Sequence, residues 1–137
     1  MVAITGEPID PAALLERISS AESGGTDVFV GRVRNQTGGK KVRKLEYSVY
    51  LPMAEKLMAQ IENEIREKWE VHDVVMVHRI GSLSVGEVAV VTAVSAVHRK
   101  EAFEACRYAI DQIKSAVPIW KREILEDGVR WGNEEAM

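Results

Sequence analysis

One short segment constrains the fold of this chain more than any other. Residues 88–94 read Val-Ala-Val-Val-Thr-Ala-Val, so a strand here would carry apolar side chains on both of its faces. Such a strand is stable in water only when other elements cover both faces. We therefore predict that the strand Glu87–Val97 lies in the centre of a sheet and is covered on both sides.

Three other segments place apolar residues at helical spacing, and we predict a helix in each. Asp10 is a good N-cap for the first helix, Pro11 suits its first turn, and two glycines end it. The predicted ranges are Pro11 to about Gly24, Pro52–Trp69 and Arg99–Ala116, with Pro118 ending the last helix. The residues predicted to face the core include Met53, Met58, Trp69, Phe103, Cys106, Ile110 and Ile113.

The remaining segments alternate apolar and polar residues or are rich in β-branched residues, which predicts strands. Near the end of one strand, Arg32 and Arg34 point one way and Val33 points the other. The predicted strands span Val2–Thr5, Thr26–Arg34, Val42–Tyr50, Val71–Leu83, Glu87–Val97 and a short stretch around Trp131, and Ile119–Glu123 is predicted as a compact segment. This order predicts one α+β domain over residues 1–137, with three main helices packed on a mostly antiparallel sheet.

The composition argues against several classes of partner and compartment. A formal net charge of −3 and an aromatic content of 6% disfavour nucleic acid, which binds cationic surfaces and exposed rings. The single cysteine cannot form an internal disulfide, and residues 1–10 lack the regions of a signal peptide. No apolar run approaches the roughly 20 residues that span a membrane. We expect a cytoplasmic protein that binds neither nucleic acid nor a membrane.

Basic residues gather where the predicted elements begin or end. One pair closes a strand, and a second pair precedes the third helix, where exposed N–H groups favour an anion. Two lysines flank the end of that helix, and a desolvated lysine can act as an acid, a base or a nucleophile. Together these residues predict a site for a small anionic substrate. They are Arg32, Arg34, His98, Arg99, Lys114 and Lys121.

Most of these residues also have an ordinary structural interpretation. Arg32 and Arg34 can be solvated side chains on a strand face, and His98 can cap the helix or pack at its start. Lys114 shares a helix face with basic residues that have acidic neighbours four positions away, so surface ion pairing is open too. Cys106 lies on the apolar stripe and is predicted to be a buried small hydrophobe. The three histidines and one cysteine show no zinc-ligand spacing.

Several strings of residues follow one another along the chain: Gly31-Arg32-Val33-Arg34-Asn35, Leu45-Glu46-Tyr47, Met53-Ala54-Glu55, His78-Arg79-Ile80-Gly81, Val85-Gly86-Glu87, His98-Arg99, Glu101-Ala102-Phe103-Glu104-Ala105 and Pro118-Ile119-Trp120-Lys121-Arg122-Glu123. In this order and at these separations they resemble the family of molybdopterin synthase large, catalytic subunits. The resemblance extends roughly from Ile4 to Trp131. Ordered motifs at matching separations are far more specific than any one of them.

The resemblance implies an α/β hammerhead-type fold and a homodimer of large subunits. A small ubiquitin-like sulfur-carrier subunit would bind at each end, which makes a heterotetramer. Its C-terminal Gly-Gly tail, carrying a thiocarboxylate, would deliver sulfur to cyclic pyranopterin monophosphate. The product would be the dithiolene molybdopterin. The resemblance implies no metal and no organic cofactor, because the sulfur arrives on the partner.

The resemblance also assigns a role to individual residues. Lys114 is expected to be the essential catalytic group, assisting attack by the thiocarboxylate sulfur, and Lys121 to aid proton transfer or hold the tail carboxylate. The residues expected to bind the substrate are Arg32, Val33, Arg34, His98, Arg99, Lys114, Lys121, Arg122 and Glu123. One departure from the family pattern is Ala96-Val97, which precedes His98 where Ser-Pro or Ser-Ala is common.

Three other functions remain open at this point. The basic residues also fit a non-enzymatic module that binds a small anion for regulation, although such a module needs neither the two lysines nor a groove for a tail. An RNA-binding α+β domain is disfavoured by the acidic balance and the few aromatic residues. A paralogue that kept the motifs and lost its partner is the third possibility.

Overall fold

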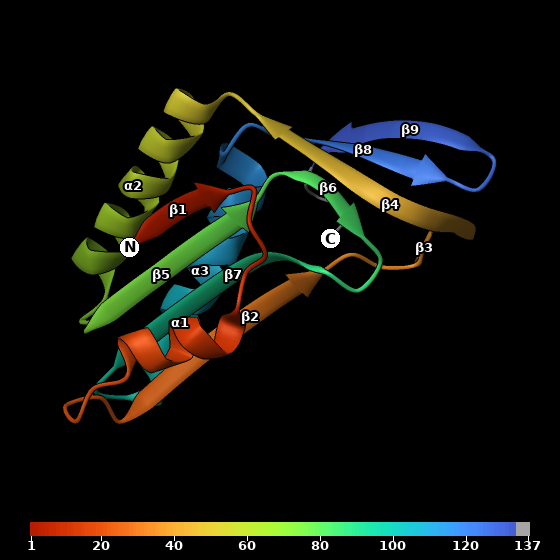
Figure 1. Cartoon of the computed structure of the whole chain (residues 1–137). Coiled ribbons are helices and arrows are strands. Elements are labelled where there is room, and N and C mark those ends of the chain that lie inside the picture. Colours follow the sequence, from red (N-terminus) through yellow and green to blue (C-terminus); the bar gives the residue numbers. More distant parts are fainter. Residues whose placement is uncertain (134–137) are drawn as a thin grey trace.

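The strand with two apolar faces lies inside a four-stranded sheet, as predicted. In this computed structural model, which describes residues 1–133, β7 (Val88–Ala96) pairs antiparallel with β5 (Asp73–Arg79) and β2 (Gly25–Arg32). β1 (Val2–Thr5) adds to β5 in parallel, giving the order β1-β5-β7-β2. Residues 89–96 are all buried. We call this the central sheet (Figure 1).

Helices cover both faces of the central sheet. On one face, α1 (Pro11–Ile18) packs Ile18 against Val75, Val77 and Ala93. On the other, α2 (Leu51–Lys68) and α3 (Arg99–Ala116) contribute Met58, Ile65 and Ile113, among others, to the larger core. Figure 1 shows α1 in front of the sheet and α3 behind it. Among the described residues, no helix is both long enough and apolar enough to cross a bilayer.

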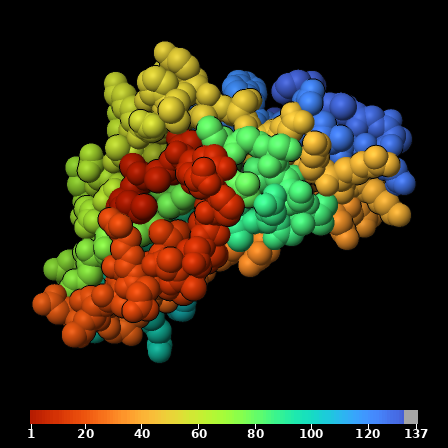
Figure 2. Space-filling view, viewed as in Figure 1, coloured from red at the N-terminus to blue at the C-terminus, as the bar shows by residue number. Residues whose placement is uncertain are grey.

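A second, five-stranded sheet stands at one end of the central sheet. It has the order β3 (Gln36–Thr37), β4 (Lys40–Val49), β8 (Ile119–Leu125) and β9 (Gly128–Asn133), and β6 (Gly81–Ser84) also pairs with β4. We call it the end sheet. Figure 2 shows its β8–β9 hairpin, in blue, and β4, in yellow-orange, on the side away from α1. Among the strands of residues 1–133, only β1 and β5 pair in parallel, so the predicted α+β fold with mostly antiparallel pairing is confirmed.

Three predicted boundaries were wrong. The predicted strand Val71–Leu83 is two strands, because Gly81 has a φ of +96° and carries the chain from the central sheet to the end sheet. The segment Ile119–Glu123 belongs to a strand, β8. The first helix ends at Ile18, where Ser19 turns to an extended conformation well before the two glycines.

Two aromatic or sulfur-containing side chains predicted to face the core are on the surface. Phe103 is 56% exposed and Met53 is 50% exposed. The buried stripe of α3 runs instead through four small residues and two isoleucines, and the small residues let the helix approach β2 and β7. Phe103 lies about 100° around the helix from Ala102, the first residue of this stripe. That stripe consists of Ala102, Ala105, Cys106, Ala109, Ile110 and Ile113.

Candidate functional site

The strand β8 places two charged side chains inside the protein. Its residues alternate, so Lys121 and Glu123 face inward together with Ile119 and Leu125. Lys121 is 2% exposed and Glu123 is 3% exposed. Among residues 1–132, these are the only buried side chains of lysine, arginine, aspartate or glutamate. Charged groups are rarely buried unless they are paired, so this pair marks the position as special.

The two buried charges belong to a chain of ionic contacts. Lys121 Nζ lies 3.6 Å from Glu123 Oε1, and Arg130 Nη2 lies 3.3 Å from Glu123 Oε2. Arg130 also donates a hydrogen bond of 3.3 Å to the Thr37 carbonyl oxygen in β3. Burial by itself would raise the pKa of Glu123, but the hydrogen bond from Arg130 and the charge of Lys121 outweigh it and hold the pKa below its ordinary value. Glu123 is therefore a carboxylate at neutral pH.

Two buried rings lie beside Lys121. Tyr47 in β4 is the direct cross-strand partner of Lys121, and both side chains face inward. The Tyr47 ring meets the His78 ring edge to face, with centroids 5.1 Å apart. His78 Nδ1 lies 2.7 Å from the Arg79 carbonyl oxygen and so donates to it. His78 is fully buried within β5, consistent with the structural role that its position in a strand suggested.

The other predicted lysine lies at the same end of the molecule. Lys114 is partly buried in the last turn of α3, three residues before Val117 caps that helix. Pro118 and the start of β8 follow directly, so the chain brings Lys114 and Lys121 to the junction of α3 with the end sheet. We call Lys114, Lys121 and Glu123 the lysine end of α3.

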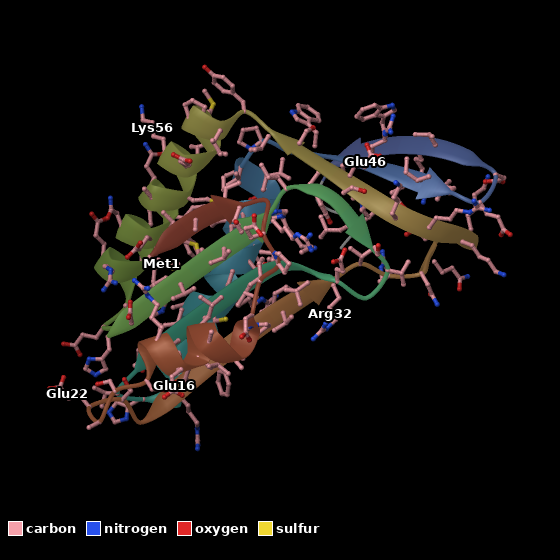
Figure 3. The ribbon with its side chains drawn as sticks, in the orientation of Figure 1. Met1, Glu16, Glu22, Arg32, Glu46 and Lys56 are labelled. Atoms are coloured by element: carbon pink, nitrogen blue, oxygen red, sulfur yellow. The ribbon has the colours of Figure 1, made fainter. Side chains whose placement is uncertain are left out.

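The strand β2 brings its basic residues to this end as well. β2 and α3 pack together and begin side by side, since a Cβ added to Gly25 would lie 3.2 Å from Arg99 Cα. At the far end of β2, Arg32 donates a 3.1 Å hydrogen bond to the Gly86 carbonyl oxygen (Figure 3). Val33 is buried, and Arg34 beyond it is exposed, which confirms the predicted alternation.

His98 and Arg99 lie at the opposite end of α3. Both are exposed, and they line a shallow cavity of ≈ 410 Å³ with Gly24, Val97 and Lys100. His98 occupies the N-cap position, yet its side chain makes no capping hydrogen bond, so capping does not account for it. The 16 positions from His98 to Lys114 correspond to about 24 Å along a helix. We call His98 and Arg99 the histidine end of α3.

Arg122 lies on the other face of the end sheet from Lys121. It makes a 2.9 Å ion pair with Glu46 and lies over the Trp131 ring, 5.7 Å from the centroid. These side chains line a groove of ≈ 530 Å³ together with Tyr47, Ser48, Gly81 and Ser82. Alternation along a strand makes this separation unavoidable for neighbours in sequence.

The single cysteine has the properties predicted for it. Cys106 is buried, and its Sγ lies 3.4 Å from the Thr92 carbonyl oxygen. Burial raises the pKa of the Cys106 thiol to about 11. A buried thiol with this pKa is a poor nucleophile at neutral pH.

Within one chain, some of the predicted site residues therefore lie together and others lie far from them. Lys114, Lys121, Glu123 and the Arg32–Arg34 segment share the lysine end, whereas His98 and Arg99 lie at the far end of the same helix. Sequence reasoning missed Tyr47 and Arg130, although each faces a β8 residue of the site across the strand pairing. Their partners follow from strand register, which no local motif encodes.

Comparisons with known proteins identify the family and the fold. A family model described as MoaE protein matches residues 4–116. The chain is 50% identical over 128 residues to the molybdopterin synthase catalytic subunit of Bacillus subtilis, covering 93% of this chain and 82% of that protein. The X-ray structure of molybdopterin synthase from Staphylococcus aureus superposes with a TM-score of 0.89 at 48% identity, covering 96% of each chain. A chain from a complex of subunits 1 and 2 of the Helicobacter pylori molybdopterin-converting factor has the same fold, with a TM-score of 0.80 at 22% identity, covering 98% of this chain and 92% of that one.

Proposed function

The chain belongs to the MoaE family of molybdopterin synthase catalytic subunits, and we propose that it is the sulfurtransferase subunit of that enzyme. In this proposal it moves two sulfurs to cyclic pyranopterin monophosphate, one from the thiocarboxylated tail of each of two small ubiquitin-like subunits, and each tail is left as a carboxylate. The dithiolene molybdopterin results. A cytoplasmic location is part of the proposal.

The observation that carries the proposal is the buried Lys121–Glu123 pair. A buried ion pair seldom adds to stability, because the loss of hydration offsets most of the attraction between the charges. Charged groups held in a desolvated position are common where a protein performs chemistry. The pair lies beside Tyr47 and at the same junction as Lys114, so a reactant at the lysine end would meet fixed polar groups rather than mobile water.

The chemistry of the reactants suits these groups. Both are anionic, since one carries a cyclic phosphate and the other a thiocarboxylate. Opening the phosphate ring builds negative charge on a phosphate oxygen, and fixed cations in a partly dry pocket stabilise that charge. We assign Lys114 the principal catalytic role, assisting attack by the thiocarboxylate sulfur. Lys121 aids proton transfer or holds the tail carboxylate, and Arg34 contributes to substrate binding.

The histidine end requires a second copy of the chain if it binds the same substrate. About 24 Å of helix separates His98 from Lys114, which is more than one pterin phosphate can span. In a homodimer, His98 and Arg99 of one chain can approach the lysine end of the other. We propose that each site combines the lysine end of one chain with the histidine end of its partner, within a heterotetramer that also holds two small subunits.

A sulfur-transfer assay tests the proposed function. The purified chain is mixed with a thiocarboxylated small subunit and cyclic pyranopterin monophosphate, and the dithiolene product is detected by fluorescence after oxidation. We expect product that requires all three components. An unmodified small subunit, ending in a carboxylate, is the matched control and should give none.

Other outcomes point elsewhere. If the small subunit binds but no product forms, the site does not transfer sulfur and the proposed activity is wrong. If the small subunit does not bind and the pterin phosphate still does, the chain is a small-anion module instead.

A further inference from the structure

Arg130 is connected to Lys121 through one carboxylate. Arg130 in β9 is the direct cross-strand partner of Glu123 in β8. The two oxygens of Glu123 are divided between two cations, with Oε1 3.6 Å from Lys121 Nζ and Oε2 3.3 Å from Arg130 Nη2. Arg130 is partly exposed, whereas the other two side chains are buried. The connection therefore runs from the surface hairpin to the interior.

A second contact fixes the guanidinium group itself. Arg130 Nη2 also donates to the Thr37 carbonyl oxygen, at 3.3 Å. A Cβ added to Gly38 would lie 3.5 Å from Arg130 Nη1, so the β3–β4 turn closes over the other nitrogen. A planar guanidinium held by a carboxylate and a backbone carbonyl has little freedom to turn. Arg130 therefore holds the Glu123 oxygen Oε2, while Lys121 pairs with the other oxygen, Oε1.

We propose that Arg130 is a positioning residue for Lys121 and acts by fixing the rotamer and the charge balance of Glu123. The inference deepens the proposed function and rests on it, since it assumes that Lys121 works in sulfur transfer. In this proposal Arg130 acts through Glu123 and contacts no reactant itself, so its role is positioning and not catalytic. The division of the Glu123 oxygens between two cations carries the proposal.

The charge balance gives this role a signature that a purely structural role lacks. With Arg130 present, the carboxylate of Glu123 is shared between two cations, and Arg130 also repels the ammonium form of Lys121. Without Arg130, the buried carboxylate has Lys121 as its remaining ion-pair partner. The ammonium form of Lys121 is then favoured more strongly, and its titration moves to higher pH.

The test compares Arg130→Gln and Arg130→Lys with the wild-type chain in the three-component sulfur-transfer assay, measured as single turnovers over a range of pH. Arg130→Gln should move the limb of the rate profile that reports Lys121 upward by about one pH unit and leave KM for the pterin phosphate within about twofold. Arg130→Lys keeps the positive charge but loses the planar guanidinium group. That limb should therefore return most of the way to its wild-type position. Arg107→Gln removes another arginine that is paired with a carboxylate, at the surface of α3, and should leave the profile unchanged.

A second readout does not depend on activity. Lysines labelled with carbon-13 at Cε report their protonation by NMR, and the Lys121 signal is assigned by its loss in Lys121→Arg. In folded Arg130→Gln the titration of Lys121 should shift upward, as the rate profile does.

Failure of the proposed function and failure of the positioning role of Arg130 give different results. A wild-type chain that makes no product overturns the proposed function, whatever the NMR titration shows. A wild-type chain that is active, with an Arg130→Gln variant that is folded by thermal unfolding and has an unchanged Lys121 titration, overturns the positioning role. A rate loss that is the same at every pH, with no shift of either profile, also assigns Arg130 to the fold alone.

Discussion

The two ends of α3 carry the same kinds of residue in opposite physical states. At the lysine end, Lys121 and Glu123 are buried, paired with each other and tied to Arg130. At the histidine end, His98 and Arg99 are exposed around a shallow cavity. Figure 3 labels Glu22, in the loop before β2, and Arg32, at the end of that strand, and shows them toward opposite ends of β2.

The difference shows which half of the site one chain can prepare by itself. The lysine end is preorganised, because its charges are fixed by each other and by packed strands. The histidine end packs against Gly24 and Gly25, where the α1–β2 loop meets β2, and its side chains face solvent. We infer that folding of one chain is enough to complete the buried lysine end. The exposed histidine end becomes part of a site only when two chains assemble.

Changes at the lysine end should have the largest effect on activity. Lys114→Ala and Lys121→Ala are each expected to lower the sulfur-transfer rate by about 100-fold or more, since each removes a positioned cation or proton carrier. Lys121→Ala should also cost about 1–3 kcal/mol of the free energy of unfolding, because Glu123 then keeps only Arg130 as an ion-pair partner. Single-turnover rates and urea unfolding measure the two effects.

Lys56→Ala is the matched control for the lysine changes, because Lys56 is exposed on α2 and lies outside both ends of α3. A Lys114→Ala chain that turns over within a few-fold of wild type would contradict the central role of that lysine.

At the histidine end the effect on activity should separate from the effect on stability. His98→Ala and Arg99→Ala are expected to raise KM for the pterin phosphate by about tenfold, because each removes a donor to an anion. Both side chains are exposed, so the free energy of unfolding should change by no more than about 0.5 kcal/mol. Steady-state kinetics and urea titration test this pair of results. If His98→Ala or Arg99→Ala lowered the free energy of unfolding as much as Lys121→Ala does, the proposed difference between the two ends would be wrong.

Substituting the glycine that packs under His98 should raise KM less than His98→Ala does. A Cβ added to Gly24 would lie 2.2 Å from the Val97 carbonyl oxygen, so Gly24→Ala must displace the turn that carries His98. We expect a KM increase of a few-fold and a loss of about 1–3 kcal/mol from overpacking. Gly6→Ala, where nothing lies within 4 Å of the added carbon, is the control. Unchanged kinetics in Gly24→Ala would show that the turn tolerates displacement.

The smallest expected effect is a change in how stability depends on pH. The pKa of Glu123 is lower in the folded chain than in the unfolded chain, so its ionised form stabilises the fold above the unfolded value of about 4.3. That contribution disappears as the pH falls through the lower, folded pKa. Glu123→Gln should therefore have a lower free energy of unfolding than wild type at pH 7. This difference between the two proteins should decrease as the pH is lowered. Urea unfolding at several pH values measures the difference, and a constant difference would mean that ionisation of Glu123 does not contribute.

The parts of the fold that sequence predicts well are those governed by local rules. The buried strand β7 followed from its two apolar faces, and the Asp10 cap followed from its side chain, which accepts from two backbone N–H groups. The alternation of Arg32, Val33 and Arg34 followed from strand geometry. Each prediction needed only neighbours in the chain.

The parts that could not be predicted depend on distant residues. The inward stripe of α3 excludes Phe103 because small residues face β2 and β7, which the helix pattern alone does not show. Arg130 meets Glu123 only through the register of the β8–β9 hairpin. The helix that separates His98 from Lys114 was, by contrast, predicted with its observed bounds, Arg99–Ala116, because its pattern and the following proline are local.

A mixed dimer tests the two-copy site most directly. Lys121→Ala and His98→Ala chains are given different tags, and the dimer that contains one of each is purified and assayed for sulfur transfer. If each site takes its lysine end from one chain and its histidine end from the other, one of the two sites is intact. With the pterin phosphate held well below KM, we predict about half of the wild-type rate, although each homodimer alone keeps about one tenth of that rate or less. A mixed dimer as inactive as either homodimer would show that both ends act within one chain, and would contradict the account.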